Sequence, residues 1–233
     1  MSEAENLEPG QKLLNAVERI TDAPETIISM VEEMCRGKDR HDEATLVEVA
    51  NKIIQKYSNR SAISGGAAAL PGIIPGLGSL AAFAGGTLID AALILKYEVE
   101  MVQALSWLHR FDIREEKERQ IALLLASVNT YESKSGRNFF VDLAETQGTA
   151  IWNYGPRQVS KMIVSVMTKI ALLSLSKGFV RALPFVGIAV GGGMNKVLTQ
   201  KVGKQSVIEL KRRKVYEKNA AAEPAVVEAQ LRA

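Results

Sequence analysis

Apolar residues in the first quarter of the chain recur at steps of three and four positions. Three such runs follow one another: Leu13–Ile20, Ile27–Met34 and Leu46–Ile54. This spacing places the apolar side chains on one face of a helix. It predicts three short amphipathic helices between residues 11 and 57, after a flexible stretch at 1–10. Pro24 suits the first turn of the second helix, where a missing N–H breaks no hydrogen bond.

The pattern changes after Ser61, because residues 62–89 carry no charged side chain and are rich in glycine and proline. Pro71 and Pro75 lack the N–H that a continuous helix needs, so we expect a break there. A long helix should follow, from about Gly78 to Phe111. At about 1.5 Å per residue it would span about 50 Å and cross the whole domain.

The second half of the chain predicts three further helices and a second glycine-rich segment. The helices are expected at 120–130, at 157–177 and at about 196–218, and the segment at 182–195. Lysines at positions 161, 169 and 177 interrupt the apolar runs of the second of these helices. No uncharged run there reaches the roughly 20 residues of a membrane span. The tail, 219–233, is expected to be flexible or weakly docked.

The two glycine-rich segments resemble each other, since ALPGIIPGLG at 69–78 parallels ALPFVGIAVG at 182–191. We interpret them as a weak internal repeat, with chance similarity between two apolar stretches as the alternative. Their small and cyclic residues are expected to form close-packing turns: Pro71, Gly72, Pro75, Gly76, Gly78, Pro184, Gly187, Gly191, Gly192 and Gly193. No segment shows a sustained two-residue alternation. The prediction is therefore all-α: a single helical domain over 11–218, with a long central helix and two Gly/Pro-broken apolar helical elements.

Positive charge is concentrated late in the chain. Residues 156–218 hold 13 basic and 2 acidic side chains, a net +11. Residues 1–61 hold 8 basic and 12 acidic, and residues 62–155 hold 7 and 10. The basic block either binds an anionic, phosphate-bearing partner or packs against the acidic part of the chain. The candidate residues for an anionic surface are Lys201, Lys204, Lys211, Arg212, Arg213 and Lys214.

Composition is that of a globular protein, with 47% hydrophobic and 24% charged residues among 233. Cys35 is the only cysteine, so an internal disulfide is excluded. The acidic N-terminal sequence MSEAENLEPG does not have the pattern of a signal peptide. These features favour a cytoplasmic location. If the basic block binds anionic lipid, the protein would lie peripherally on the inner face of the membrane.

The sequence SGGAAALPGIIPGLGSLAAFAGGTLIDAALILKYEVEMVQALSWLHRFD, with the later ALPFVGIAVGGGMNK, resembles the EcsC family of bacterial proteins in content, order and spacing. The resemblance covers roughly residues 40–215. It departs from the family at HRFD, 109–112, where a Tyr-Gly-like pair is expected. The resemblance implies an all-helical protein of unestablished biochemical role, and it carries over no catalytic site.

Asp90 is the one ionisable group inside the first apolar segment. A buried carboxylate needs a donor or a partner, because an unpaired one costs several kcal/mol. We expect Asp90 to be buried and to contact Asn195 or Lys196, which end the second glycine-rich segment. A direct ligand or ion role for Asp90 is the alternative.

No catalytic, metal or cofactor site is predicted. His41 and His109 lack a metal-ligand spacing, and Cys35 has no neighbouring histidine base. The glycines at 72–78 lack the Lys-Ser/Thr pair of a phosphate-binding loop. A cluster of acidic residues around 112–118 is explained by a helix start.

Two functions from different classes remain. The first is a non-enzymatic protein that meets an anionic membrane surface or phospholipid through its basic region and its apolar segments. The second is a soluble module that binds a protein partner without membrane contact; a homo-oligomer is compatible with both. The scarcity of aromatic residues near LysArgArgLys at 211–214 disfavours nucleic acid. An enzyme with a site not visible in sequence is the third interpretation.

Overall fold

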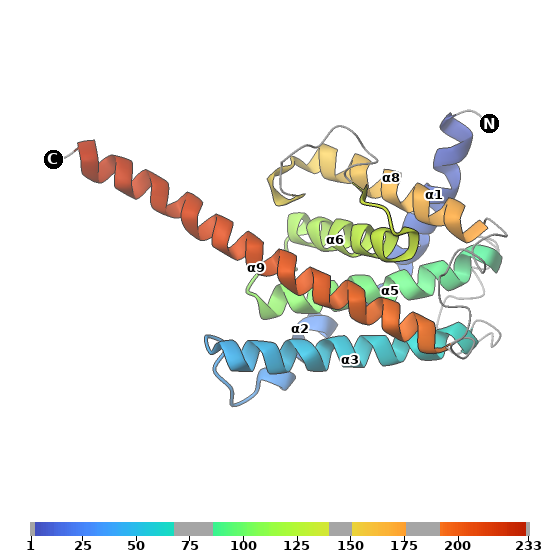
Figure 1. Ribbon diagram of the computed structural model, residues 1–233, viewed down its shortest axis with the longest axis horizontal. Helices are drawn as coiled ribbons and strands as arrows, with labels where there is room; N and C mark the ends of the chain where they lie inside the picture. Colours follow the sequence, from blue (N-terminus) through green and yellow to red (C-terminus); the bar gives the residue numbers. More distant parts are fainter. Residues whose placement is uncertain (1–2, 68–85, 140–150, 176–191, 232–233) are drawn as a thin grey trace.

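The computed structural model describes residues 3–67, 86–139, 151–175 and 192–231. Over these residues the protein is helical and contains no strand, which confirms the all-α prediction. The helices are α1 Glu3–Ile20, α2 Pro24–Cys35, α3 Glu43–Ala67, α5 Gly86–Leu108, α6 Glu116–Ser135, α8 Pro156–Leu175 and α9 Gly192–Leu231, with a short 3-10 turn at Ile151–Asn153. Figure 1 shows them as a bundle from which the end of α9 projects.

The helices agree with the apolar periodicity in position and differ in length. Pro24 is the first residue of α2, as predicted, because its missing N–H would have no partner in that turn. α1 begins at Glu3, before the predicted start at residue 11, and α3 continues past the predicted third run to Ala67. α9 continues to Leu231, beyond the predicted end near residue 218.

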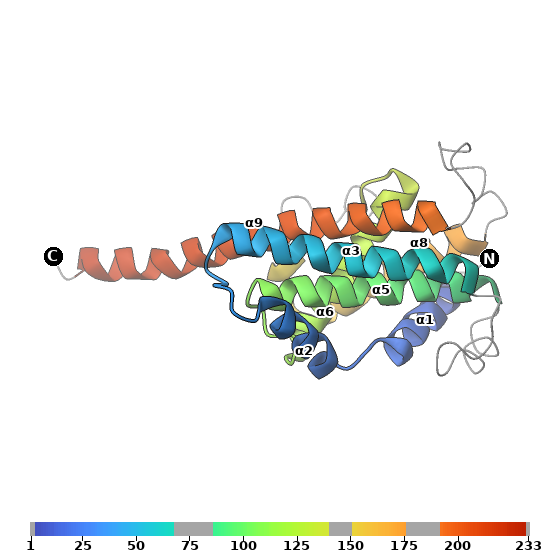
Figure 2. The same ribbon diagram turned by 90° about the horizontal axis from the view of Figure 1, so that it is seen from below.

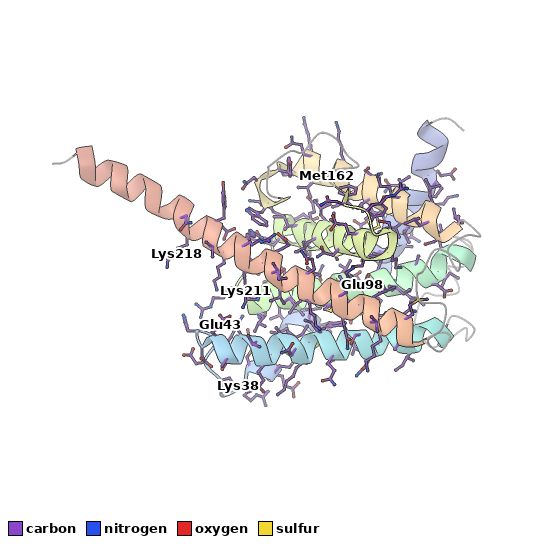
Figure 3. The ribbon with its side chains drawn as sticks, viewed as in Figure 1. Lys38, Glu43, Glu98, Met162, Lys211 and Lys218 are labelled. Atoms are coloured by element: carbon purple, nitrogen blue, oxygen red, sulfur yellow. The ribbon has the colours of Figure 1, made fainter. Side chains whose placement is uncertain are left out.

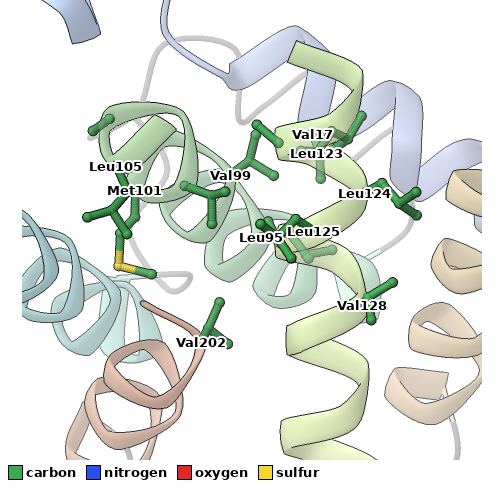
Figure 4. Packing of buried hydrophobic residues seen from close by; sticks show 14 of the residues in the cluster. Val17, Leu95, Val99, Met101, Leu105, Leu123, Leu124, Leu125, Val128 and Val202 are labelled. Atoms are coloured by element: carbon green, nitrogen blue, oxygen red, sulfur yellow. The ribbon is translucent and has the colours of Figure 1, made fainter. Parts of the chain in front are cut away.

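α5 is the central helix, in contact with α1, α2, α3, α6, α8 and α9. Figures 1 and 2 show it lying between α3 and α9 on one side and α1, α6 and α8 on the other. Its side chains are apolar almost all round, which is typical of a helix enclosed by others. Leu95, Met101 and Leu105 are fully buried. Figure 4 shows Leu95 beside Leu125 of α6, while Met101 points toward α3 and α9.

Gly203 lets α9 approach α3 and α5 closely. A Cβ atom at this position would lie 2.7 Å from Ile54 Cγ1 and 3.0 Å from Met101 Sδ. Such distances are too short for carbon and sulfur atoms in contact. The absence of a side chain at residue 203 therefore fixes how tightly α9 crosses the bundle.

α8 is, within the described parts of the chain, the one helix long and apolar enough to cross a membrane. Its apolar face is used inside the protein, since Val159, Val166 and Ile170 are buried and α8 packs against α1 and α6. A core helix has the same composition, so α8 is weak support for a membrane span.

The predicted close-packing turns fall largely outside the described residues: Pro71, Gly72, Pro75, Gly76, Gly78, Pro184, Gly187 and Gly191. Gly192 and Gly193 are the first two residues of α9. The internal repeat stays a prediction.

Candidate functional site

A cavity of about 500 Å³ lies where α3 begins, α5 ends and α9 passes. We call it the basic pocket; its lining residues are Arg40, His41, Glu43, Leu46, His109, Arg110, Lys211, Lys214, Val215 and Lys218. Five of these side chains are basic and one is acidic. Figure 3 shows Glu43, Lys211 and Lys218 at this end of the bundle.

Arg110 reaches the pocket from an unusual turn at the end of α5. Its φ angle is 70°, a left-handed conformation that costs a non-glycine residue about 1–2 kcal/mol. The turn is closed by two backbone hydrogen bonds, from Arg110 N to Trp107 O and from Phe111 N to Ser106 O, both 2.9 Å. These are the two bonds of a Schellman motif, in which glycine normally occupies this position. Here the position carries a guanidinium, which donates to Nε2 of His41.

Arg40, between α2 and α3, is held against the end of α5. Its Nη1 lies 2.9 Å from Glu32 Oε1, and its Nη2 donates to the carbonyl oxygen of Trp107. Its guanidinium also lies 5.7 Å from the centre of the Trp107 ring. The Nε of Arg40 is buried and has no hydrogen-bond partner among the residues that the structure describes.

His109 is 3% exposed and lines the pocket. Its Nε2 is buried, and no hydrogen-bond partner for it occurs in the described part of the chain. Burial, with the positive charges of Lys214 and Lys211, lowers the pKa of His109 to about 4. The imidazole is therefore neutral at pH 7, and as a neutral ring it carries one N–H donor and one lone pair.

The lysines of α9 complete the pocket. Lys211 Nζ lies 2.5 Å from Glu43 Oε1, an exposed pair that holds the pKa of Glu43 below its usual value. Lys214 and Lys218 are exposed and have no ion pair among the described residues. Of the predicted anion-binding residues, Lys211 and Lys214 thus lie in the pocket.

Arg213 is only 5% exposed, so the prediction that it serves an anionic surface is wrong. Residues 211–214 make up about one turn of α9, so their side chains point in different directions. Position 213 falls on the side of the helix that packs against the bundle. Its guanidinium binds the carboxylate of Glu118 on α6 and lies 4.0 Å from the centre of the Phe111 ring. Arg212, in contrast, is exposed and pairs with Glu209.

Lys201 and Lys204 are exposed on α9 outside the basic pocket. They lie on the outward face of that helix, which also exposes Val197, Ile208 and Val215, at 64%, 45% and 60%. Basic and aliphatic side chains therefore alternate along this face.

Asp90 is exposed on α5, so the expectation that it is buried is wrong. Tyr97 lies two turns further along the same helix and is only partly buried. Asp90 and Tyr97 therefore lie on the least covered side of an otherwise enclosed helix. Asn195 and Lys196 are half-buried on α9. No hydrogen bond or ion pair joins Asp90 to either of them within the described residues.

The buried carboxylate of the bundle is Glu98 instead, at 0% exposure on α5. Thr199 Oγ1 donates to Glu98 Oε1 at 3.1 Å, and Thr130 Oγ1 lies 2.5 Å from Oε2. Ser61 Oγ is 3.0 Å from Thr199 Oγ1. Burial raises the pKa of Glu98, while the charge of Lys134 and the two threonines oppose the shift. Periodicity could not single out Glu98, because α5 is buried on nearly every side.

A second cavity, of about 360 Å³, lies between α1, α5 and α6. It combines both signs of charge, with Glu18, Asp22 and Glu116 near Arg119. No group of three metal-ligating side chains occurs among the residues that the structure describes. The basic pocket is therefore the stronger candidate, because its charge is nearly all of one sign.

The chain matches no protein-family model, no curated protein and no solved structure. The resemblance to the EcsC family stays a prediction.

Proposed function

We propose that this protein binds anionic phospholipid surfaces peripherally, through the basic pocket and the outward face of α9. The observation that carries the proposal is the convergence of five basic side chains and one carboxylate on a single cavity. Like charges gathered in this way repel one another, and an anion in the pocket offsets that repulsion.

The apolar residues beside the pocket favour a membrane over a soluble anion. Val215 lines the pocket mouth and is 60% exposed, and Tyr216 next to it is 46% exposed. Basic side chains with adjacent exposed aliphatic and aromatic residues are typical of segments that lie in a lipid interface. Each lysine near such a surface contributes about 1 kcal/mol of attraction.

An acidic protein partner is the second candidate. The pairing of Lys211 with Glu43 supports this candidate, because it sets a carboxylate against a lysine of the pocket. A protein partner of this kind would bind without lipid, so vesicle binding separates the two proposals.

The experiment is flotation with vesicles of phosphatidylcholine alone and of phosphatidylcholine mixed with phosphatidylserine, at low and at high salt. We expect binding to the mixed vesicles at low salt, and loss of that binding as salt screens the charges. The triple variant Lys211→Gln/Lys214→Gln/Lys218→Gln should bind about 100-fold more weakly, because three losses of about 1 kcal/mol each add up to about 3 kcal/mol.

A matched control removes the same charge elsewhere. Lys52, Lys117 and Lys161 are exposed and lie outside the basic pocket. Their triple glutamine variant should bind nearly as well as the wild type. If the two variants lose the same affinity for the mixed vesicles, the effect comes from net charge and not from the basic pocket. If the wild type does not bind the mixed vesicles, the membrane proposal is excluded.

A further inference from the structure

The wall of the basic pocket holds more donors than its own acceptors satisfy. His109 is almost fully buried, and within the described residues its Nε2 has no hydrogen-bond partner. The Nε of Arg40 lacks one as well. Buried polar groups are normally paired, and leaving one unpaired costs about 1–3 kcal/mol.

The charged groups of the pocket are also mostly hydrogen-bond donors. Lysine and arginine are donors only, and they reach the cavity from the α2–α3 connection, from the end of α5 and from α9. Glu43 is the single carboxylate, and its side chain is 68% exposed. A complementary ligand is therefore rich in acceptors and carries more than one negative charge.

From these unpaired and positively charged groups we infer that the basic pocket is a binding site for a phosphate monoester, with Arg110, Lys211 and Lys214 around the phosphate and Nε2 of His109 as a further donor. The inference rests on the proposed function in taking the pocket as an anion site, and it applies equally to a lipid headgroup and to a soluble phosphate.

A monoester fits the pocket better than a diester does. It carries close to two negative charges at pH 7 and three terminal oxygens. A diester has one charge and two such oxygens, so it satisfies fewer donors. The phosphatidylserine headgroup is such a diester, and its ammonium and carboxylate groups offset each other, so its net charge stays at one.

His109 reports on occupancy of the pocket. The groups that set its charge are Lys211 and Lys214 from α9, which disfavour the imidazolium, and Glu43 at the start of α3, which favours it. Arg40, His41 and Arg110 line the same cavity. A bound dianion offsets the positive charges around the ring, so the pKa of His109 should rise and binding should take up protons below neutral pH.

The experiment follows the imidazole resonances of His109 by NMR in the wild-type protein as glycerol 3-phosphate or dimethyl phosphate is added. We expect saturable shifts with glycerol 3-phosphate and at least about tenfold weaker binding of the diester. Absence of any shift, or equal affinity for both compounds, would overturn the inference. The measurement needs no mutation, so it does not depend on a variant that folds.

Two variants assign the effect to the pocket. Arg110→Gly removes the guanidinium from a position whose backbone suits glycine, so the turn should be preserved. Arg114→Ala is the control, since Arg114 lies over the Trp107 ring at 4.9 Å and outside the pocket. We expect about a tenfold loss of glycerol 3-phosphate affinity for Arg110→Gly only; equal affinities of the two variants would contradict the site.

Vesicles with phosphatidic acid and with phosphatidylserine, matched in charge, identify the source of the phosphate. Stronger binding to phosphatidic acid, lost in Arg110→Gly, supports a lipid monoester. If glycerol 3-phosphate binds and no vesicle does, the site stands as one for a soluble ligand and the membrane proposal fails. If both vesicles bind equally and glycerol 3-phosphate does not bind, the membrane proposal stands and the monoester site fails.

Discussion

The guanidinium of Arg213 on α9 faces the carboxylate of Glu118 on α6 through two parallel contacts, Nη1 to Oε2 at 2.6 Å and Nη2 to Oε1 at 2.7 Å. Both side chains are nearly inaccessible, and Nε of Arg213 also donates to Glu217 at 2.8 Å. Two-point pairing of this kind fixes both distance and orientation. The pair therefore locks α9 onto α6 beside the basic pocket.

Removing one partner of this pair should be costly. We expect Arg213→Ala to lower the free energy of unfolding by about 3–5 kcal/mol, because it leaves the carboxylate of Glu118 buried and uncompensated. The double variant Arg213→Met/Glu118→Leu should recover most of the loss, since it removes both charges. Urea denaturation followed by circular dichroism measures all three proteins. Arg212→Ala is the control, expected within about 0.5 kcal/mol of wild type because Arg212 is exposed.

Gly203 should tolerate no side chain without a shift of α9. Gly203→Ala would bring a methyl group against Ile54 and Met101, at a cost of about 1–3 kcal/mol from overpacking. Gly193→Ala, in the same helix with open space around its Cβ position, should instead be neutral or stabilise by up to about 1 kcal/mol. Thermal melts of the two variants give the comparison, and equal melting temperatures would contradict the close approach.

His109 should make stability depend on pH below neutrality. Its pKa is about 4 in the folded protein, against an ordinary value of 6.5. Between these values the unfolded chain binds more protons than the folded one, so stability is lost as the pH falls, by at most about 1.4 kcal/mol per unit from this group.

The measurement is the free energy of unfolding at several values of pH between 7 and 4 for wild type and His109→Phe. The variant should have a shallower dependence on pH than the wild type. Identical slopes for wild type and His109→Phe would show that His109 is not held neutral by burial.

The hydroxyl of Thr199 should contribute to stability through Glu98. Thr199→Val preserves the shape of the side chain but removes the donor to Glu98 Oε1, which should cost about 1–3 kcal/mol. Thr199→Ser keeps a hydroxyl and should lose less. Denaturant melts compare the two variants with the wild type, and a Thr199→Val protein as stable as the wild type would contradict a contribution of the hydroxyl.

The candidate site could be predicted from the sequence only in part. The excess of basic residues after 156 singled out Lys211 and Lys214, because charge density is visible without a structure. The same argument included Arg213, which the structure buries against Glu118. It could not find His109 or Arg110, since nothing in their local sequence connects them with a helix that comes a hundred residues later.

The sequence by itself determined the helical class, the central position of the long helix and the place of the basic block. Each follows from a local property: the period of apolar residues sets which face of a helix is buried, and composition sets its charge. Only the tertiary structure decided which polar groups meet. It exposes Asp90 and encloses Glu98 on the same helix, and it joins the ends of α3, α5 and α9 into one pocket. These outcomes depend on the rotation and crossing distance of helices remote in sequence, which the close approach at Gly203 fixes and local periodicity does not encode.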